Sequence, residues 1–542
     1  MDNIPLLQET AATLTARNAK KFSGQTAFIF DGAAYSWAAV EGLTDRIAAV
    51  MLKKGIRKGT HVGFWSMNHI HLVLYLIAAM KLGAVAAVIN YSYRTFELRN
   101  VLRRADIELL FLGENKKGAD YRTMVEEVWA DCPCLREVWD IEPDLEAVCQ
   151  AYPVNTSLSQ ETVSTLREAK LAVVPDDVAA ITFTSGTTKE PKPVMLTHSS
   201  IINDVAQFTH RMRVSVENKD VLMAPLPLFH CSGLSGMLFF ALVVGIPTII
   251  HRSFIAQTAL EDIEQYQVTA LMAVPTMLEL MIHYEDFSKF DISSLRIVQT
   301  SGSSTSPAKL RKITQDLGLE SMLIGYGQTE CSPLITTVLY DDDLTTQTET
   351  VGIPLPHEEV RIWDLKNDCE LPAGQTGEIQ VRGCNTMKGY YNFPEEQAKK
   401  YTPDGWLKTT DSGYFDVRGY LHFVARISEN IIRHGENISP AEVEYVIEQY
   451  SADILTVKVI GVPEPVVQEE VACLIQTKNG VKLDAQDLRR FVKSQLASFK
   501  VPKYVFQVDE FPMTATGKID QCAVKRIAAE WAEQERKKQP VS

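Results

Sequence analysis

One stretch of the chain gathers the groups that bind phosphate. TFTSGTTKEPKPVMLTH, residues 182–198, places five hydroxyl residues around Gly186 and follows them with Lys189 and Lys192. Hydroxyl donors, ammonium groups and backbone amides left accessible by glycine are what phosphate oxygens require. The stretch is not the common phosphate loop, because Pro191 stands where G-x-x-x-x-G-K-[ST] has its second glycine. The alternative is a polar surface turn, which many clusters of Ser, Thr and Gly form.

The residues on either side predict a loop that joins a strand to a helix. Residues 178–183 are a continuous apolar run, which is typical of a buried strand. Ile201, Ile202, Val205 and Phe208 then recur on one helical face. Ligands of open α/β sheets tend to bind at such strand-to-helix turns.

The same alternation of elements extends over much of the chain. Residues 39–56 have a helical pattern, residues 61–67 an apolar strand pattern, and both patterns recur within 72–89 and 270–284. A helix that ends near a glycine and leads into a short apolar strand is the rhythm of a layered α/β domain. We therefore predict an α/β fold with a large N-terminal domain over residues 1–427.

A smaller C-terminal domain is predicted over residues 428–542. Ser439 as N-cap, Pro440 at the first helical position and Glu442 in a capping box predict the start of a helix. The charged end, residues 533–542, is expected to fray. The region then has a helical pattern over 484–496 and strand patterns over 454–462, 469–477 and 504–511, which together predict a small α+β unit.

Size and charge exclude several classes of protein. A chain of 542 residues is too long for one compact core. Its 54 Lys and Arg against 68 Asp and Glu give a net charge of −14, which repels nucleic acid and anionic membranes. The longest apolar run, residues 237–250, contains Gly245 and Pro247 and is shorter than the roughly 20 residues that span a bilayer.

The start of the chain and the cysteines indicate the compartment. MDNIPLLQET lacks a basic segment followed by an apolar core, so no signal peptide is apparent. The nine cysteines form no C-x-x-C pair, and reduced thiols are the expected state. We expect a cytoplasmic protein with no nucleic-acid partner and no membrane span.

Six further motifs follow the phosphate-binding stretch in a fixed order. They are PLPLFHCSG, TSGSS, GYGQTE, GWLKTTDSG, VARISENIIRHGENISPAEVE and PMTATGK. In this order the series resembles the adenylate-forming superfamily of acyl-CoA synthetases, luciferases and peptide-synthetase adenylation domains, over Gln25 to Lys518. The acyl-CoA synthetase branch is the most similar. The resemblance implies the adenylate-forming enzyme fold, with a mobile C-terminal domain, and an acid–thiol ligase that uses ATP, Mg²⁺ and coenzyme A.

The resemblance also implies a set of nucleotide-binding residues. Tyr326 would lie against adenine, Asp411 and Arg426 would contact the ribose, and Thr184 with Glu330 would hold Mg²⁺. The β- and γ-phosphates would be held by Thr184, Ser185, Gly186, Thr187, Thr188 and Lys192. The remaining nucleotide-binding residues would be Ser301, Gly302, Gly325, Gly327, Gln328 and Gly435.

Three residues are implied to be catalytic: Lys518, Glu330 and Thr329. An ammonium between a carboxylate and the α-phosphate lowers their repulsion as they approach, which acts on the transition state. The family uses two arrangements of the small domain in its two steps, and Glu429 matches the hinge, where Asp or Lys is usual.

The chain departs from the family pattern at several positions. Lys189, Pro193 and Thr410 stand where glycine is usual, and Ser428 replaces a common lysine. Pro193 removes a backbone donor. Lys189 either adds a cation that contacts pyrophosphate or is solvated.

The acyl pocket is expected to include His230, Cys231, Gly233, Ser303 and Ile324, together with Ser301, Gly302 and Gly325. Amino-acid-activating relatives have an aspartate after the phenylalanine of this region, but here His230 follows Phe229. A pocket without that carboxylate disfavours a substrate ammonium. His230 could instead be a packed core residue.

The substrate is therefore expected to be a small-molecule carboxylic acid, with a fatty or related hydrophobic acid favoured. One alternative is an enzyme that loads a carrier protein instead of coenzyme A. Another is a noncatalytic nucleotide-binding protein of this fold. No feature of the sequence sets an oligomeric state.

Overall fold

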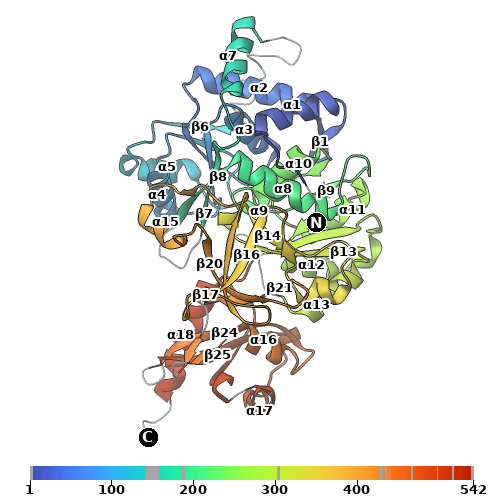
Figure 1. Ribbon diagram of the computed structural model, residues 1–542, viewed down its shortest axis with the longest axis vertical. Helices are drawn as coiled ribbons and strands as arrows, with labels where there is room; N and C mark the ends of the chain where they lie inside the picture. Colours follow the sequence, from blue (N-terminus) through green and yellow to red (C-terminus); the bar gives the residue numbers. More distant parts are fainter. Residues whose placement is uncertain are drawn as a thin grey trace. The chain divides into compact units, whose positions relative to one another are not determined.

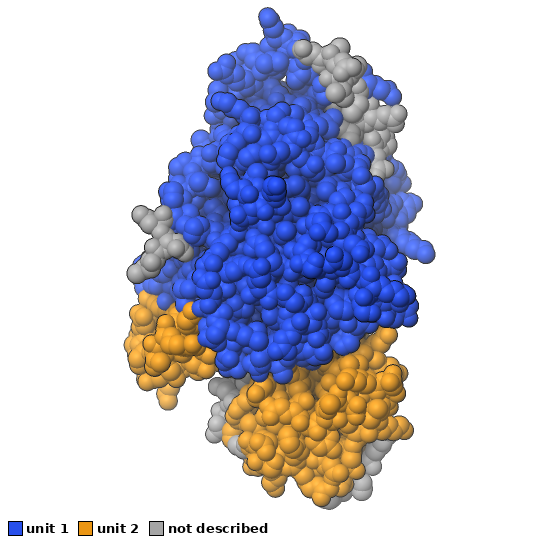
Figure 2. All heavy atoms as spheres, turned by 90° about the vertical axis from the view of Figure 1, so that its right-hand side faces the viewer, with its two compact units in different colours: residues 1–302, 307–360, 381–407 blue, residues 303–306, 361–380, 408–542 orange. Residues whose placement is uncertain are grey.

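The computed structural model describes residues 4–141, 150, 158–184, 191–301, 305–427, 431–433, 436–438, 440–464, 468–496, 498–514 and 518–538. The chain forms two compact units, and each is described by itself (Figure 2). Unit 1 comprises residues 1–302, 307–360 and 381–407, and unit 2 comprises residues 303–306, 361–380 and 408–542. The predicted domain boundary after residue 427 stays a prediction, because compactness does not locate a hinge.

The first sheet of unit 1 has nine strands among the described residues, and its six central strands from β1 to β13 run parallel. β2, β14 and β15 are added antiparallel at the edges. In spatial order the strands are β15 (Ile353–Pro354), β14 (Leu334–Thr337), β13 (Ser321–Gly327), β12 (Ile297–Ser301), β11 (Ala270–Ala273), β9 (Leu222–Met223), β10 (Thr248–Ile249), β1 (Thr26–Phe30) and β2 (Ala33–Ser36).

The second sheet has seven strands among the described residues, and five of them run parallel. β8, which is labelled near β7 in Figure 1, pairs antiparallel with β7 and with the short strand β19. In spatial order the strands are β19 (Gly389–Tyr390), β8 (Lys192–Thr197), β7 (Val178–Thr184), β4 (Val85–Ile89), β3 (His61–Trp65), β5 (Leu109–Leu112) and β6 (Glu137–Asp140).

β8 corrects one expectation from the sequence. The stretch after Thr184 was expected to lead directly into a helix, but it returns along β7 as an antiparallel strand before the helix begins. Val194 and Leu196 are buried, so one face of β8 joins the core, while Lys192 and Pro193 make the six residues look like a loop in the sequence. Thr184 and Lys192 are register partners at the end of this hairpin where β7 leads toward β8.

Helices connect and cover the parallel strands, as the alternating pattern predicts. In α8 (His198–Met212) the hydroxyl of Thr197 accepts from the Ser200 backbone, and Ile201 and Phe208 are fully buried. The other helices of unit 1 are α1 (Ala11–Lys21), α2 (Trp37–Lys53), α3 (Ile70–Lys81), α4 (Thr95–Arg104), α5 (Tyr121–Val128), α7 (Gln160–Leu171), α9 (Cys231–Gly233), α10 (Phe240–Val244), α11 (Ala256–Tyr266), α12 (Pro275–Ile282), α13 (Pro307–Asp316), α14 (Leu344–Glu349) and α15 (Pro394–Lys400).

The apolar run at residues 237–250 is divided between helix and strand. A π-helical segment, Leu234–Phe239, leads into α10 and then β10. Among the residues that the structure describes, no helix combines the length and the apolar character needed to cross a membrane.

A third sheet, of five strands among the described residues, contains the motif around Asp411. Two of its strands, β20 and β21, form an antiparallel pair with an irregularity after Ser412. In spatial order the strands are β17 (Cys369–Glu370), β16 (Glu358–Asp364), β18 (Gly377–Gly383), β20 (Leu407–Phe415) and β21 (Leu421–Arg426).

The fourth sheet belongs to unit 2 and is covered by helices on both faces. Val471, Cys473 and Ile475 of β25 face the core with α16 and α17, whereas Ala472 and Leu474 face the core with α18, as the alternation of a strand requires. The elements are β22 (Ile431–Arg433), β23 (Glu436–Ile438), β24 (Ile454–Glu464), β25 (Gln468–Thr477), β26 (Tyr504–Val508), α16 (Pro440–Glu448), α17 (Ala485–Gln495) and α18 (Gln521–Lys538).

The end of the chain corrects a second expectation. Residues 533–538 were expected to fray, but α18 continues to Lys538. Ala528 and Ala532 are fully buried in the core of unit 2, so packing extends the helix beyond its apolar part. The other predicted elements of this region, two helices and three strands, are confirmed.

Candidate functional site

Part of the predicted phosphate loop can be described. Thr184 ends β7 and Lys192 begins β8 directly opposite it. Ser185, Gly186, Thr187, Thr188 and Lys189 lie outside the described residues. The hairpin therefore brings the two ends of the predicted loop together and leaves the role of its middle as a prediction.

Lys192 is paired with a carboxylate from α15. Its Nζ lies 2.5 Å from Oε2 of Glu396 and 5.4 Å from the ring centre of Tyr390. Hydrogen bonds from Lys192 and from Lys399 lower the pKa of Glu396 to about 2. Lys192, the predicted phosphate contact, is thus already paired with the carboxylate of Glu396.

The motif GYGQTE runs along β13 into a short 3₁₀ turn, Thr329–Cys331. Only glycine fits at position 327, because a Cβ there would lie 1.9 Å from the carbonyl oxygen of Pro333. Tyr326 is buried on β13. The Nε2 amide of Gln328 is buried and makes no hydrogen bond within the part of the chain that the structure describes.

Glu330 is a buried carboxylate that two other side chains contact. Its Oε1 accepts a hydrogen bond of 2.6 Å from the phenol of Tyr390, and Nζ of Lys400 lies 3.7 Å from the same oxygen. Burial, and then the charge of Glu330, raise the pKa of Tyr390, so its phenol stays protonated and can donate. Lys400 also donates to Oε1 of Gln328 at 3.3 Å.

The predicted catalytic Thr329 contacts the predicted acyl pocket. Its hydroxyl lies 3.4 Å from Sγ of Cys231, which is buried. His230 caps the short helix α9, where its Nδ1 accepts from the backbone of Ser232. A Cβ on Gly233 would lie 2.1 Å from the carbonyl oxygen of Pro227, so only glycine fits this turn.

The ends of two parallel strands bring further predicted residues together. Ser301 of β12 is the register partner of Gly325 of β13, and Thr300 is the partner of Ile324. Carboxyl ends of neighbouring parallel strands form one edge, which is where open α/β sheets bind ligands. Gly302 and Ser303, which follow, lie outside the described residues.

The donors present fit a magnesium ion held partly by phosphates. Mg²⁺ is usually bound by one or two carboxylates together with substrate phosphates rather than by a cage of protein ligands. The predicted ligands are the buried carboxylate of Glu330 and the hydroxyl of Thr184, and their joint role stays a prediction. Among the described residues there is no cluster of three or more His, Cys, Asp or Glu that could hold a metal. The set suits a metal that arrives with ATP.

Unit 2 carries the other predicted residues. Asp411 and Arg426 are cross-strand register partners on β20 and β21, with Oδ1 and Nε 3.6 Å apart. Thr410, which stands where glycine is usual, has a φ of +65°. A β-branched residue in this left-handed region is strained, which explains the preference for glycine there.

The backbone of the predicted catalytic Lys518 is hydrogen-bonded to Thr514. The Thr514 backbone N–H donates to the carbonyl of Lys518 at 2.6 Å, and the Thr514 hydroxyl accepts from the Lys518 backbone at 3.2 Å. Both the N–H and the carbonyl of the Lys518 backbone are therefore hydrogen-bonded to Thr514. Glu429, the predicted hinge, and Gly435 lie outside the described residues.

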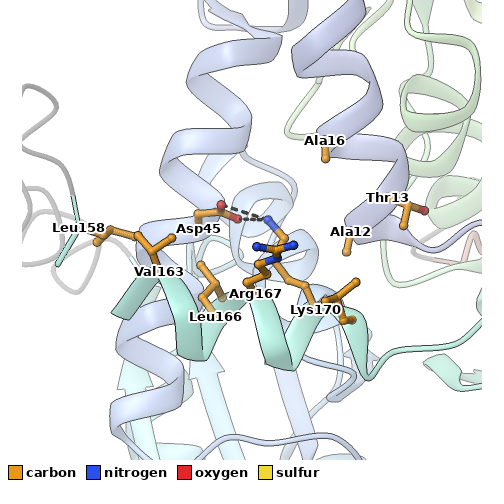
Figure 3. Close-up of a pocket in the computed structure, with 10 residues that line it drawn as sticks. Ala12, Thr13, Ala16, Asp45, Leu158, Val163, Leu166, Arg167 and Lys170 are labelled. Carbon is orange, nitrogen blue, oxygen red and sulfur yellow. Dashed lines mark hydrogen bonds and ion pairs between the residues drawn. The ribbon is translucent and has the colours of Figure 1, made fainter. Parts of the chain in front are cut away.

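A pocket elsewhere in unit 1 is separate from these residues. It has a volume of about 250 Å³ and lies between α1, α2 and α7, where Asp45 and Lys170 pair beside apolar walls (Figure 3). None of its ten lining residues belongs to the predicted site. We therefore do not assign the chemistry to it.

Comparison with known proteins decides the family. The model of the AMP-binding enzyme family matches residues 15–391, and that of the AMP-binding enzyme C-terminal domain matches residues 442–518. The chain belongs to the AMP-binding enzyme family. It is an AMP-forming ligase, and the resemblance of its motifs to adenylate-forming enzymes is confirmed.

Individual members of the AMP-binding enzyme family are similar over nearly their whole length. The putative acyl-CoA synthetase YngI of Bacillus subtilis is 31% identical, over 97% of this chain and 98% of its own. The mitochondrial medium-chain acyl-CoA ligase ACSF2 of Danio rerio is 31% identical, over 95% and 88%. The crystal structure of ATP-bound MatB from Rhodopseudomonas palustris is 25% identical, with a TM-score of 0.82 over 96% of this chain and all of that one. These likenesses confirm the predicted fold class.

Four residues of this site were missed in the sequence. Tyr390, Glu396 and Lys400 contact the predicted residues Glu330 and Lys192, and Gln397 accepts a hydrogen bond from the backbone of Tyr390. The only sequence signal is the charged run PEEQAKK just before GWLKTTDSG, which on its own describes any surface helix.

Proposed function

We propose that the protein is an ATP-dependent acyl-CoA ligase that activates a fatty or related hydrophobic carboxylic acid in the cytoplasm. The observation that carries the proposal is the grouping around Tyr390, where Lys192 and Glu330 from separate motifs meet one aromatic side chain. A cation and a buried carboxylate side by side are suited to a metal-bound polyphosphate. The names of the relatives support the choice of substrates.

The proposed reaction has two steps. An oxygen of the carboxylate attacks the α-phosphorus of ATP, the bond to the β-phosphate oxygen breaks, and pyrophosphate leaves. The sulfur of coenzyme A then attacks the acyl carbon, its thiol proton is released, and AMP leaves with the electrons of the broken C–O bond. The first step joins two anions, so fixed positive charge and aligned donors supply most of the rate enhancement.

The residues of the chain divide these tasks. Lys192 binds the β- and γ-phosphates, Thr329 donates to the α-phosphate, and Lys518 lies between carboxylate and phosphate in the first step. Tyr390 orients Glu330 through its 2.6 Å hydrogen bond. When bound, Mg²⁺ would be held by Glu330 and Thr184 and would neutralise phosphate charge.

The acid is proposed from the residues of the predicted acyl pocket. Ser301, Ile324 and Gly325 line one strand edge and carry no charge, and His230 stands where an ammonium-binding aspartate would be needed for an amino acid. An uncharged wall favours an apolar acyl chain, because burial of a charge without a partner is costly.

The test is a library of carboxylic acids assayed for AMP release with and without coenzyme A. Release that needs both a hydrophobic acid and coenzyme A is the expected result. AMP release without a thioester product would favour transfer to a carrier protein, and a protein that binds ATP but releases no AMP with any acid would contradict an enzymatic role. Cell fractionation tests the proposed compartment.

A further inference from the structure

Helix α15 presents two opposite charges on one face. Pro394 stands at its first turn, Glu396 follows in that turn, and Lys400 lies one turn later at i+4. Both side chains are partly buried rather than extended into solvent, at 28% and 13% exposed. An acidic first turn and a basic last turn agree with the helix dipole.

The position of α15 is fixed by β19. The side-chain oxygen of Gln397 accepts from the Tyr390 backbone at 3.0 Å. Gly389 has a φ of +145°, and a Cβ there would lie 3.0 Å from the same Gln397 oxygen, so strand and helix are in close contact. Because β19 pairs with β8, the helix is tied to the strand that begins at Lys192.

Two charges on α15, those of Glu396 and Lys400, are held by residues of the proposed nucleotide site, and Glu396 also pairs with Lys399 of the same helix at 2.9 Å. The carboxylate of Glu396 contacts the ammonium of Lys192, which is proposed to bind phosphate. The ammonium of Lys400 contacts Glu330 and Gln328, of which Glu330 is proposed to meet the metal. Glu396 thus occupies the position next to Lys192 that a phosphate oxygen would take. Lys400 occupies the position next to Glu330 that a metal cation would take.

The amide of Gln328 gives an independent indication of a ligand here. Its Nε2 is buried and has no hydrogen-bond partner among the described residues, while its Oε1 accepts from Lys400. A buried donor left without an acceptor is unfavourable unless a ligand supplies one. An anion at this position would meet both Gln328 and Lys400.

We propose that Glu396 and Lys400 are positioning residues of the nucleotide site, which exchange partners when a magnesium-bound triphosphate enters. Lys192 exchanges Glu396 for a phosphate oxygen, and Lys400 exchanges Glu330 for another. This proposal rests on the proposed function, because it needs ATP as the ligand. It adds two residues that none of the sequence motifs contains.

The two residues have opposite effects on nucleotide affinity. Glu396 competes with phosphate for Lys192 and repels the triphosphate, so its neutralisation favours binding. Lys400 is attracted to the triphosphate, so its neutralisation disfavours binding. A helix that only supports the fold would give changes of the same sign for both, since either variant would loosen the same contacts.

The experiment measures the dissociation constant of ATP with Mg²⁺ by calorimetric titration of the full chain. We expect Glu396→Gln to lower the constant about two- to fivefold, the range of a partly exposed ion pair. We expect Lys400→Gln, whose side chain is more buried, to raise it about three- to tenfold. Melting temperatures within a few degrees of the wild type confirm that both variants fold.

Matched controls remove the same charges elsewhere. Glu395→Gln changes the exposed neighbour of Glu396, and Lys312→Gln breaks the exposed pair with Asp316 on α13. Neither control should change the dissociation constant of ATP by more than the error of the titration. In a Lys192→Gln background Glu396→Gln should have a smaller effect, because the competition for Lys192 is gone and only the repulsion of the triphosphate remains.

Two results would overturn the proposal. The first is a shift of the constant in the same direction for Glu396→Gln and Lys400→Gln, and the second is a response of both variants equal to that of the controls. A wild-type protein that binds no ATP overturns the proposed function as well, whereas tight wild-type binding with unaltered variants overturns the role of α15 alone.

Discussion

Replacement of Tyr390 by phenylalanine tests how much the hydrogen bond from Tyr390 contributes to the carboxylate of Glu330. The change removes one oxygen atom and the 2.6 Å hydrogen bond to the carboxylate, and both side chains are buried, at 6% and 7% exposed. A hydrogen bond to a charged group contributes about 1.5–3 kcal/mol. Water cannot easily replace the lost donor at this depth, so we expect the free energy of unfolding to fall by that amount.

The same loss should appear in catalysis if Glu330 acts as proposed. Each 1.36 kcal/mol corresponds to a factor of about ten in rate, so the range above predicts a fall of about 10- to 150-fold in kcat/KM for ATP. The value is an upper range, because Lys400 remains 3.7 Å from the carboxylate and holds part of its orientation. The assay is AMP release at saturating acid and coenzyme A, beside denaturant unfolding of the same preparations.

The neighbouring residue provides a matched control. The phenol of Tyr391 also donates to a carboxylate, that of Asp106, at 3.0 Å, but the side chain is only half-buried. Tyr391→Phe should therefore cost less than about 1 kcal/mol and leave kcat/KM unchanged. An equal loss of activity in the two variants would refute the reasoning, because it would show that Glu330 gains nothing from Tyr390.

Three further perturbations have defined outcomes. Lys518→Ala should abolish most pyrophosphate exchange, by about 10²–10³-fold or more, yet leave thioester formation from synthetic acyl-AMP nearly intact; equal loss of both would contradict its assignment to the first step alone. Thr410→Gly should stabilise the protein by up to about 1.5 kcal/mol, since a φ of +65° costs a β-branched residue about 1–2 kcal/mol and glycine loses about 0.5–1 kcal/mol in chain entropy. Thr410→Ala, which keeps the Cβ, should bring no such rise in Tm. Burial raises the pKa of Glu358 from 4.5 to about 8, so the folded protein holds a proton that the unfolded chain has lost, and stability should fall as the pH rises from about 5 through 8. Burial raises the pKa of Asp204 in the same sense, so Glu358→Gln should reduce the slope without removing it, and denaturant unfolding at several pH values that gave an unchanged slope would exclude Glu358 as its source.

The spacing of apolar residues predicted helices and strands well wherever one face of the element, or all of it, is buried. The helical face with Ile201 and Phe208 and the strand over 178–183 follow from apolar spacing alone, and both are confirmed. Ser301 and Gly325 were grouped by the family resemblance alone, and the parallel pairing of β12 with β13 gives the physical reason that they are neighbours.

Long-range pairing explains what the sequence did not reveal. β8 contains a lysine and a proline and looks like part of a loop, and it becomes a strand because β7 lies on one side and Gly389–Tyr390 on the other. The contact of Glu396 with Lys192 spans 204 positions. No periodicity in a single sequence reports such a contact, so α15 had no visible link to the site.

The pairing of β8 with β19 has a consequence for synthesis of the chain. Until residues 389–390 have been made, β8 is the last strand of its sheet, with backbone N–H and C=O groups open to pairing with other chains. Translation adds roughly 5–20 residues per second, so this edge stays open for roughly 10–40 s on each ribosome. Chains that end before Gly389 should therefore aggregate during expression, and chaperones that cover exposed strand edges should act on this protein in the same interval.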